Sequence, residues 1–242
     1  MIPNTKADTS PQLYARIGGL AYLFIIIAGA TGELFIRNTL LVQGNAAATA
    51  NNIAASPLLW RIGIAGDLLM HVCDLIVAIV YYKLLRPVNR DLALLAVFFG
   101  LIQTAVLVAN KMNMVMPLLL ENADYLKAFT SEQLQAWTYL SVKSHGYGFG
   151  IGLIFFGFEC LIDGWLIIRS GYLPKVLGVM IQIAGLCYLV NSFALILAPK
   201  LANTLSPAIL LPPFVGELSI CLWLIFKGVN LVKWNERART DF

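Results

Sequence analysis

The stretch from Ser144 to Arg169 constrains the fold of this chain more than any other part of the sequence. It is apolar over more than the roughly 20 residues that a helix needs to cross a bilayer. It nevertheless contains His145 at its start and Glu159 and Asp163 toward its end. Ionisable side chains are costly in hydrocarbon and normally face the interior of a helix bundle or a wet cavity. The stretch therefore predicts a central membrane helix with one functional or pore-lining side.

The rest of the chain has the same character. Hydrophobic residues make up 59% of the 242 residues and charged residues only 12%, whereas about a quarter of a soluble domain is charged. Apolar segments of spanning length predict an all-α polytopic membrane protein, a bundle of six transmembrane helices that forms a single domain over residues 1–242. The predicted spans are residues 14–35, 58–85, 92–118, 141–169, 175–198 and 208–232.

The connections between the spans carry signals of their own. Residues 38–56 are rich in small and amide side chains, which is typical of a loop or a short surface helix. Thr130, followed three residues later by Gln133, matches a capping box and predicts a helix start near Ser131. A helix from there to the end of the fourth span is longer than a bilayer is thick, so its first turns should project from the membrane. Residues 234–242 are expected to form a polar tail.

Lysine and arginine residues are divided unevenly between the two sides of the predicted bundle. Because cytoplasmic loops of membrane proteins are enriched in these residues, the richer side is predicted to be cytoplasmic and to hold both termini. The net charge of +4 is not gathered on a basic face of the kind that nucleic-acid binding needs. The poorer side has Arg37, Lys127, Lys143 and Lys200, and the richer side has Lys6, Arg16, Lys83, Arg86, Arg90, Arg169, Lys175, Lys227, Lys233, Arg237 and Arg239.

Polar residues inside the spans are the candidates for a site. Asp67, His71 and Asp74 share one stripe of the second helix, and Glu33 and Arg37 lie one turn apart at the end of the first. When the polar residues are placed by depth, more of them fall in the outer half of the membrane, which predicts a polar cavity that opens outward. The candidate ligand-binding residues are Glu33, Arg37, Arg61, Asp67, Asp74, His145 and Glu217.

A structural role for these residues is the alternative. Asp67 or Glu217 would then form interhelical salt bridges with Arg61 or Lys111. Polar pairs across membrane helices are worth about 0.6–2 kcal/mol, so such pairs are ordinary stabilising contacts. The sequence alone does not decide between a site and a set of salt bridges.

The two histidines do not predict a metal site. Zinc catalysis uses three protein ligands, and the obvious set is Asp67, His71 and His145. By helical rise, however, His145 lies about 15 Å outside the plane of His71, so the two cannot share one ion. The four cysteines lie in apolar segments without a CxxC pair. No metal is predicted, and the sequence leaves open whether the protein has a cofactor.

Glycines on the fourth span predict a contact face. Gly146 with Gly150, and Gly148 with Gly152, form two overlapping pairs of small residues four apart. Such pairs let a neighbouring helix approach closely. The Gly146–Gly152 face is therefore a candidate surface for a homo-oligomer, in addition to the lipid bilayer that surrounds the bundle.

Four runs of the sequence resemble a known family. They are GELFIRNTLLVQGNAAATANNI, RIGIAGDLLMHVCDLIVAIVYYKLLRPVNRDLALLA, HGYGFGIGLIFFGFECLIDGWLIIRSGYLPKVLGV and GELSICLWLIFKGVN. From about Tyr14 to Trp234, the chain resembles a bacterial membrane family catalogued as domain of unknown function 4386. The resemblance implies six spans and a multi-pass protein of the bacterial cytoplasmic membrane, and it implies no activity.

The resemblance also bears on the candidate residues. His71 and Glu159 depart from the family pattern, which further disfavours a metal site at His71. The resemblance therefore implies an outer pocket of Glu33, Arg37, Asp67, His145 and Glu217. The positions that match the pattern are Glu33, Arg37, Asp67, Asp74, His145, the RSGYLP turn and Glu217.

Three functions fit these observations. The first is an integral membrane protein that binds a small molecule or ion in an outward-facing polar pocket, for transport or sensing. The second is an intramembrane metal-dependent hydrolase that uses His145 with Asp67. The third is a non-catalytic scaffold whose glycine face binds partner helices. Whether the protein is an enzyme is left open by the sequence.

Overall fold

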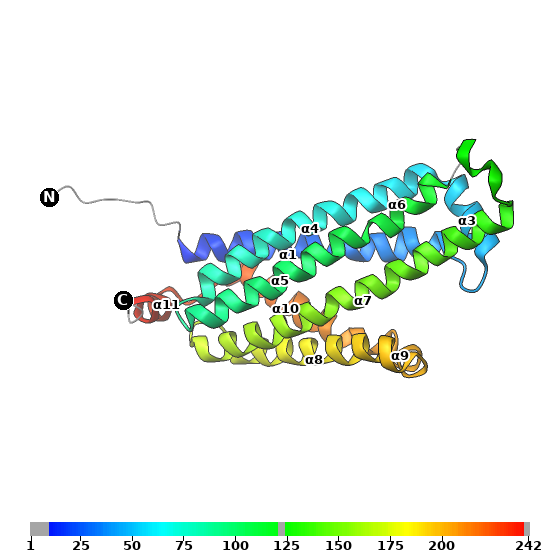
Figure 1. The fold of residues 1–242 in the computed structure, drawn as a ribbon. Coiled ribbons are helices and arrows are strands. Elements are labelled where there is room, and N and C mark those ends of the chain that lie inside the picture. The colour runs from blue at the N-terminus through cyan, green and yellow to red at the C-terminus, as the bar shows by residue number, and fades with distance from the viewer. Residues whose placement is uncertain (1–9, 121–123, 240–242) are drawn as a thin grey trace.

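The structure, a computed structural model, describes residues 10–120 and 124–239, and within these residues it is a bundle of helices without strands (Figure 1). In chain order the helices are α1 (Pro11–Thr31), the π-helix η1 (Gly32–Arg37), α2 (Asn38–Leu40), α3 (Ala46–Ala55), α4 (Pro57–Leu85), α5 (Arg90–Asn110), α6 (Met112–Leu119), η2 (Asp124–Ala128), α7 (Ser131–Ser170), α8 (Lys175–Leu197), α9 (Pro199–Leu205), η3 (Ala208–Leu210), α10 (Leu211–Phe226) and α11 (Leu231–Arg239).

Six helical stretches in the described part of the chain are long and apolar enough to cross a membrane. The first joins α1, η1 and α2 (Pro11–Leu40), the third joins α5 and α6 (Arg90–Leu119), and the sixth joins η3 and α10 (Ala208–Phe226); α4, α7 and α8 are the others. Large exposed side chains on these helices, such as Phe24 and Ile79, are apolar, as contact with lipid requires. The predicted all-α membrane protein with six spans is confirmed.

The six spans form a closed ring. Each helix packs against its neighbours in the order α1, α4, α5, α7, α8 and α10, and α10 packs back against α1. Apolar side chains fill the ring in two clusters, a larger one that includes Leu84 and Ile220 and a smaller one around Trp60. Polar residues separate the two clusters along α4, where the order is Trp60, Ile64, Asp67, His71, Asp74, Val80 and Leu84.

The sixth span ends earlier than the sequence pattern predicts. It stops at Phe226 rather than at residue 232, because Gly228 has a φ of +66°, a left-handed conformation that favours glycine. The side-chain amide of Gln12 holds this turn, since it donates to the Lys227 carbonyl at 2.8 Å and accepts from the Val229 amide at 3.1 Å. The chain then continues as α11, where a polar tail was predicted.

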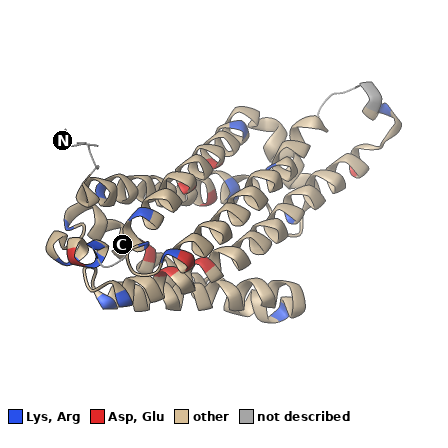
Figure 2. Cartoon of the chain, turned by 60° about the vertical axis from the view of Figure 1, so that its left-hand side comes forward, with Lys and Arg blue, Asp and Glu red and all other residues tan. Residues whose placement is uncertain are grey.

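We call the end of the bundle that contains the start of α1 and all of α11 the basic end. Figure 2 shows lysine and arginine residues gathered there. All the described residues of the basic-rich set predicted above lie on α1, α11 or the helix ends and turns of this end; Lys6 lies outside the described residues. The beginning of α1 and the end of the sixth span meet at this end through Gln12.

Helix α7 is the longest element, with 40 residues. The predicted capping box is confirmed: the Gln133 amide donates to the Thr130 hydroxyl at 3.3 Å, and the Thr130 amide donates to the Gln133 side chain at 2.8 Å. The first turns of α7 pack against α3 at the end opposite to the basic end (Figure 1). The Gly44 amide also donates to the Tyr139 hydroxyl there, at 2.7 Å.

Glycines allow the helices of the ring to approach closely. A Cβ atom added at Gly164 would lie 2.6 Å from the carbonyl oxygen of Gly178, so α7 and α8 touch through their backbones. On the predicted oligomer face, added Cβ atoms at three glycines would meet side chains of this same chain: Gly148 meets Asn110, Gly150 meets Leu195 and Gly152 meets Leu107. Only Gly146, among these four, has open space beside it. Self-association through this face stays a prediction.

Candidate functional site

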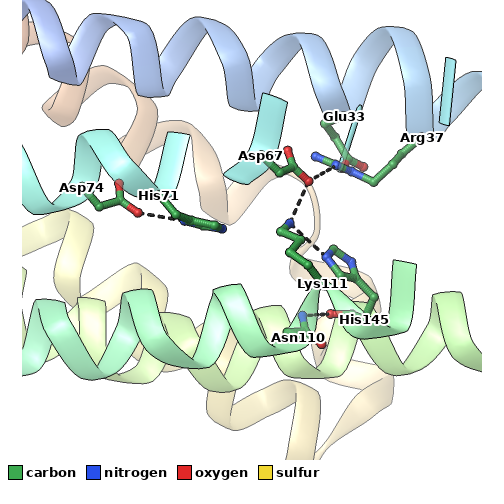
Figure 3. A network of polar contacts seen from close by, with 8 residues as sticks. All are labelled: Glu33, Arg37, Asp67, His71, Asp74, Asn110, Lys111 and His145. Carbon is green, nitrogen blue, oxygen red and sulfur yellow. Dashed lines mark hydrogen bonds and ion pairs between the residues drawn. The ribbon is translucent and has the colours of Figure 1, made fainter. Parts of the chain in front are cut away.

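Asp67 lies at the centre of a buried ionic network between three spans. Its Oδ2 atom accepts from the Arg37 guanidinium at 2.8 Å and from the Lys111 ammonium at 2.7 Å (Figure 3). Only 1% of the Asp67 side chain is exposed, with 13% for Arg37 and 7% for Lys111. Lys111 also contacts His145 of α7, with 3.2 Å between Nζ and Nε2. We call Arg37, Asp67, Lys111 and His145 the Asp67 network.

The Arg37 side chain reaches Asp67 because the first span changes its winding. Residues Gly32–Arg37 form a π-helix, a feature that is frequent at functional sites. A Cβ atom at Gly32 would lie 3.1 Å from Asp67 Oδ1 and 3.2 Å from an Arg37 nitrogen, so glycine leaves the room that the ion pair occupies. Glu33 pairs with Arg37 Nε at 2.7 Å and is 56% exposed. The network therefore extends from the interior to the surface.

The third span is interrupted at Lys111, between α5 and α6. Beyond this break, Pro117 lies inside α6 and has no amide hydrogen to donate to the carbonyl of Asn113, four residues earlier. That carbonyl accepts instead from the Ser141 hydroxyl of α7. The Met114 carbonyl accepts from the Trp60 indole of α4 at 2.7 Å. Neighbouring helices thus satisfy the backbone that the proline leaves without its partner, as a membrane interior requires.

The Ser141 hydroxyl takes the place of the missing Pro117 amide as the donor to the Asn113 carbonyl, which gives a first prediction. Ser141→Ala should lower the free energy of unfolding by about 1–3 kcal/mol, because it leaves the Asn113 carbonyl without a partner inside the bundle. The loss should be smaller in a Pro117→Ala background, where the amide of residue 117 is available to that carbonyl. A double-mutant cycle on the detergent-purified protein measures the coupling. Equal losses in both backgrounds would contradict the assignment.

His145 acts as an acceptor in the network. An ammonium group only donates hydrogen bonds, so the contact with Lys111 requires an unprotonated Nε2 and places the ring proton on Nδ1. The helix that carries His145 is held against the third span by Asn110, whose side-chain amide donates to the His145 carbonyl at 2.8 Å. Asn113 in turn donates to the Asn110 side chain at 2.9 Å.

The structure brings together four of the seven residues that were predicted as ligand-binding, namely Glu33, Arg37, Asp67 and His145. Asp74 lies further along α4 and contacts His71 instead, with 2.9 Å between Asp74 Oδ2 and His71 Nδ1.

The other two predicted residues lie apart from the network. Arg61 is exposed and takes part in none of the ion pairs that the described residues form. Glu217 accepts from the Tyr188 hydroxyl at 2.5 Å, between α10 and α8, and makes no contact with the Asp67 network; its role in ligand binding stays a prediction.

Lys111 and Asn110 were missing from the predicted set. The signal for Lys111 is a lysine inside an apolar segment, flanked by the amides of Asn110 and Asn113. The structure realises one of the salt bridges weighed above, between Asp67 and Lys111. The predicted cavity is closed at this point, because the network side chains contact one another and are buried.

The arrangement does not resemble a metal centre. The Lys111 ammonium lies between Asp67 and His145, at the point where an ion shared by the two would have to be. Within residues 10–120 and 124–239, no three His, Cys, Asp or Glu side chains converge as metal ligands do. What the network can do chemically is hold one negative group between two cations.

Fold and network together define a multi-pass membrane protein with a buried ionic site between its spans. The chain matches the family described as "Domain of unknown function (DUF4386)" over residues 17–228, and it therefore belongs to that family. It is also similar to an "Uncharacterized protein" of the archaeon Archaeoglobus fulgidus, with 30% identity over 169 residues, which are 69% of this chain and 85% of that protein. No solved structure matches the chain. The predicted family is confirmed.

Proposed function

We propose that this protein binds a small anion at the Asp67 network and carries it across the membrane. One observation carries the proposal: Arg37 and Lys111, from two different spans, both donate to the same oxygen of Asp67, from a third span. Ionisable residues inside membrane spans are rare and commonly mark substrate and ion pathways. A small carboxylate, or an anion of similar chemistry, can take the place of the Asp67 carboxylate between the same two donors.

When an external anion replaces the Asp67 carboxylate between Arg37 and Lys111, binding of the anion is coupled to movement of the spans. The Asp67 carboxylate holds α4 to the first and third spans, so an anion that takes both donors releases α4 from them. The first and third spans are irregular at this level, at the π-helix and at Lys111. Transporters commonly bind their substrates at interrupted helices near the middle of the membrane. These interruptions support a rearrangement of the spans around a bound anion.

The distribution of lysine and arginine indicates the side of the membrane from which an anion would reach the network. The excess of lysine and arginine supports a cytoplasmic basic end. The Asp67 network then lies in the half of the bundle that faces outward. Glu33, which is 56% exposed and pairs with Arg37, lies at the edge of the network.

The proposal is tested by thermal unfolding of the protein in lipid nanodiscs, with formate, acetate, succinate, phosphate and ammonium as separate additions. At least one anion should raise the unfolding temperature in a concentration-dependent manner, because a ligand of the native state stabilises it. Arg37→Gln and Lys111→Met should abolish that shift. Arg61→Gln, which removes an exposed arginine near the same end of α4, is the matched control and should retain it. No anion effect, or equal loss in Arg61→Gln, would contradict the proposal.

A scaffold function is the second candidate, and one observation favours it. Every charged member of the Asp67 network is paired inside the chain, as expected of structural salt bridges. The two readings differ in the nanodisc experiment, since a scaffold has no anion-dependent shift. The hydrolase hypothesis receives less support, because Lys111 stands between the two residues that it requires.

A further inference from the structure

His71 is a buried polar residue that the anion site does not use. Only 2% of the residue is exposed. Its Nδ1 atom contacts Asp74, while its Nε2 atom has no hydrogen-bond partner among the described residues. A buried nitrogen without a partner costs about 1–3 kcal/mol. Packing alone does not explain an imidazole in this position, since an apolar ring of similar size would avoid that cost.

The contacts of His71 define its tautomer and its direction. With Asp74 ionised, the contact requires that Nδ1 carry the proton, which leaves Nε2 as an acceptor. Figure 3 shows the Nε2 end of the ring directed along α4 toward Asp67 and Lys111. Asp67 and His71 are one helical turn apart, about 6 Å of rise. The ring therefore bridges two levels of the bundle: it is bonded to Asp74 on one side and faces the Asp67 network on the other.

Asp74 belongs to a second polar level, nearer to the basic end. The charges of Asp163, Asp74 and Glu217 all act on Glu159 of α7. We call these four residues the carboxylate layer. None of the described ion pairs joins a member of this layer to a lysine or arginine. Carboxylates on neighbouring spans without a lysine or arginine partner can take up protons, so this layer is a suitable proton acceptor.

We propose that His71 is the central link of a proton relay between Asp67 and the carboxylate layer. Imidazole can accept a proton at one nitrogen and release another from the second nitrogen. A proton from the Asp67 side binds Nε2 and gives an imidazolium; the Nδ1 proton then passes to the Asp74 carboxylate, which becomes neutral. Asp67 is ionised and His71 is neutral at the end of the step, so charge and protons balance. Before a second proton can pass in the same direction, the ring must rotate so that a protonated nitrogen again faces Asp74, because transfer in the opposite direction moves no net proton.

The relay deepens the proposed function and rests on it for the role of Asp67. A proton on Asp67 frees Arg37 and Lys111 for an anion, so proton movement and anion binding are coupled at one carboxylate. Asp163 lies seven residues before the end of α7, about 10 Å from the basic end by helical rise. Charged and titratable groups on the other spans of the ring include Tyr22, Glu33 and Arg37 on the first span, Lys111 on the third, His145, Glu159, Cys160 and Asp163 on α7, and Glu217 on α10.

The relay is tested by proton flux without any transported solute, so that it can fail independently of the anion site. The full chain is reconstituted into vesicles of phosphatidylcholine and phosphatidylglycerol that contain a pH-sensitive dye, and a potassium diffusion potential drives protons. Wild-type protein should conduct protons faster than protein-free vesicles do. His71→Gln and Asp74→Asn should reduce the flux to the protein-free level, and Cys73→Ala, on the same helix, should not. Wild-type flux at the protein-free level, or undiminished flux in His71→Gln, would overturn the proposal.

A second measurement serves if His71→Gln does not fold. The chain contains only two histidines, so nitrogen NMR of histidine-labelled wild-type protein in bilayers resolves both rings, and His145→Gln assigns them. The relay predicts that His71 populates both of its neutral tautomers, with the proton on Nδ1 and on Nε2, in spectra recorded between about pH 5 and 8, because each transfer converts one tautomer into the other. A His71 ring that stays in one neutral tautomer throughout this range contradicts the relay, because such a ring cannot carry a proton.

Discussion

Replacing Asp67 by leucine is expected to destabilise the protein more than any other single change in the network. The substitution leaves the Arg37 guanidinium and the Lys111 ammonium buried without their shared carboxylate. Removing one partner of a buried ion pair costs about 3–5 kcal/mol. For a protein of this size, such a loss corresponds to a fall in unfolding temperature on the order of 10 °C. Thermal unfolding of the detergent-purified protein, followed by tryptophan fluorescence, measures it.

Two further variants show whether the effect comes from the unpaired charges. Arg61→Leu changes an exposed charge near the same end of α4 and should alter the unfolding temperature little. Asp67→Leu combined with Lys111→Met removes the ammonium group that Asp67→Leu leaves without a carboxylate, so it should recover part of the stability that Asp67→Leu loses. The contradicting result is additivity: the double variant loses as much stability as the separate Asp67→Leu and Lys111→Met variants lose together. In that case the two residues are not coupled, and the central ion pair is wrongly assigned.

A single added methyl group at Gly164 is expected to have the second largest effect. The new Cβ atom would lie 2.6 Å from the Gly178 carbonyl oxygen and 3.0 Å from the Gln182 amide nitrogen. Both are backbone atoms, which cannot rotate away as a side chain can, so α7 and α8 must separate. Overpacking of this kind costs about 1–3 kcal/mol. Gly164→Ala should therefore lower the free energy of unfolding, measured by titration with a denaturing detergent.

Gly146→Ala is the matched control for this prediction. It lies on the same helix, and an added Cβ atom there meets nothing within 4 Å. Alanine has a higher helix propensity than glycine by about 1 kcal/mol, so Gly146→Ala should be neutral or stabilising in the monomer. A loss of stability in Gly164→Ala together with unchanged or higher stability in Gly146→Ala supports the packing of α7 on α8. A destabilised Gly146→Ala variant would instead indicate a helix or a second copy packed on this face.

The membrane class and the six spans follow from the sequence because each span satisfies its own backbone and needs a long apolar segment. The start of α7 was also predictable, because its capping-box residues, Thr130 and Gln133, are only three residues apart in the sequence. The end of the sixth span was not, because the positive φ of Gly228 depends on Gln12, which is distant in the sequence.

The composition of the network was only partly predictable, for a related reason. Depth and helical stripe indicate that Asp67 and Arg37 are buried polar residues, but they do not say which spans are neighbours in the ring. Lys111 reaches Asp67 because α4 lies beside α5, and Glu217 misses the network because α10 lies between α8 and α1. Helical rise also places residues on straight helices, whereas the π-helix and the break at Lys111 change the positions of the side chains beyond them.

The most direct test of the account is chemical rescue of Asp67→Ala, which removes the carboxylate and leaves space in its place. If Arg37 and Lys111 form an anion site, added acetate should occupy that space and raise the unfolding temperature of Asp67→Ala as its concentration increases. Wild-type protein at the same acetate concentrations should respond less, because its own carboxylate competes. The combined variant Asp67→Ala/Lys111→Met should lose the rescue. An Asp67→Ala protein that acetate does not stabilise, or stabilises equally without Lys111, would contradict the account.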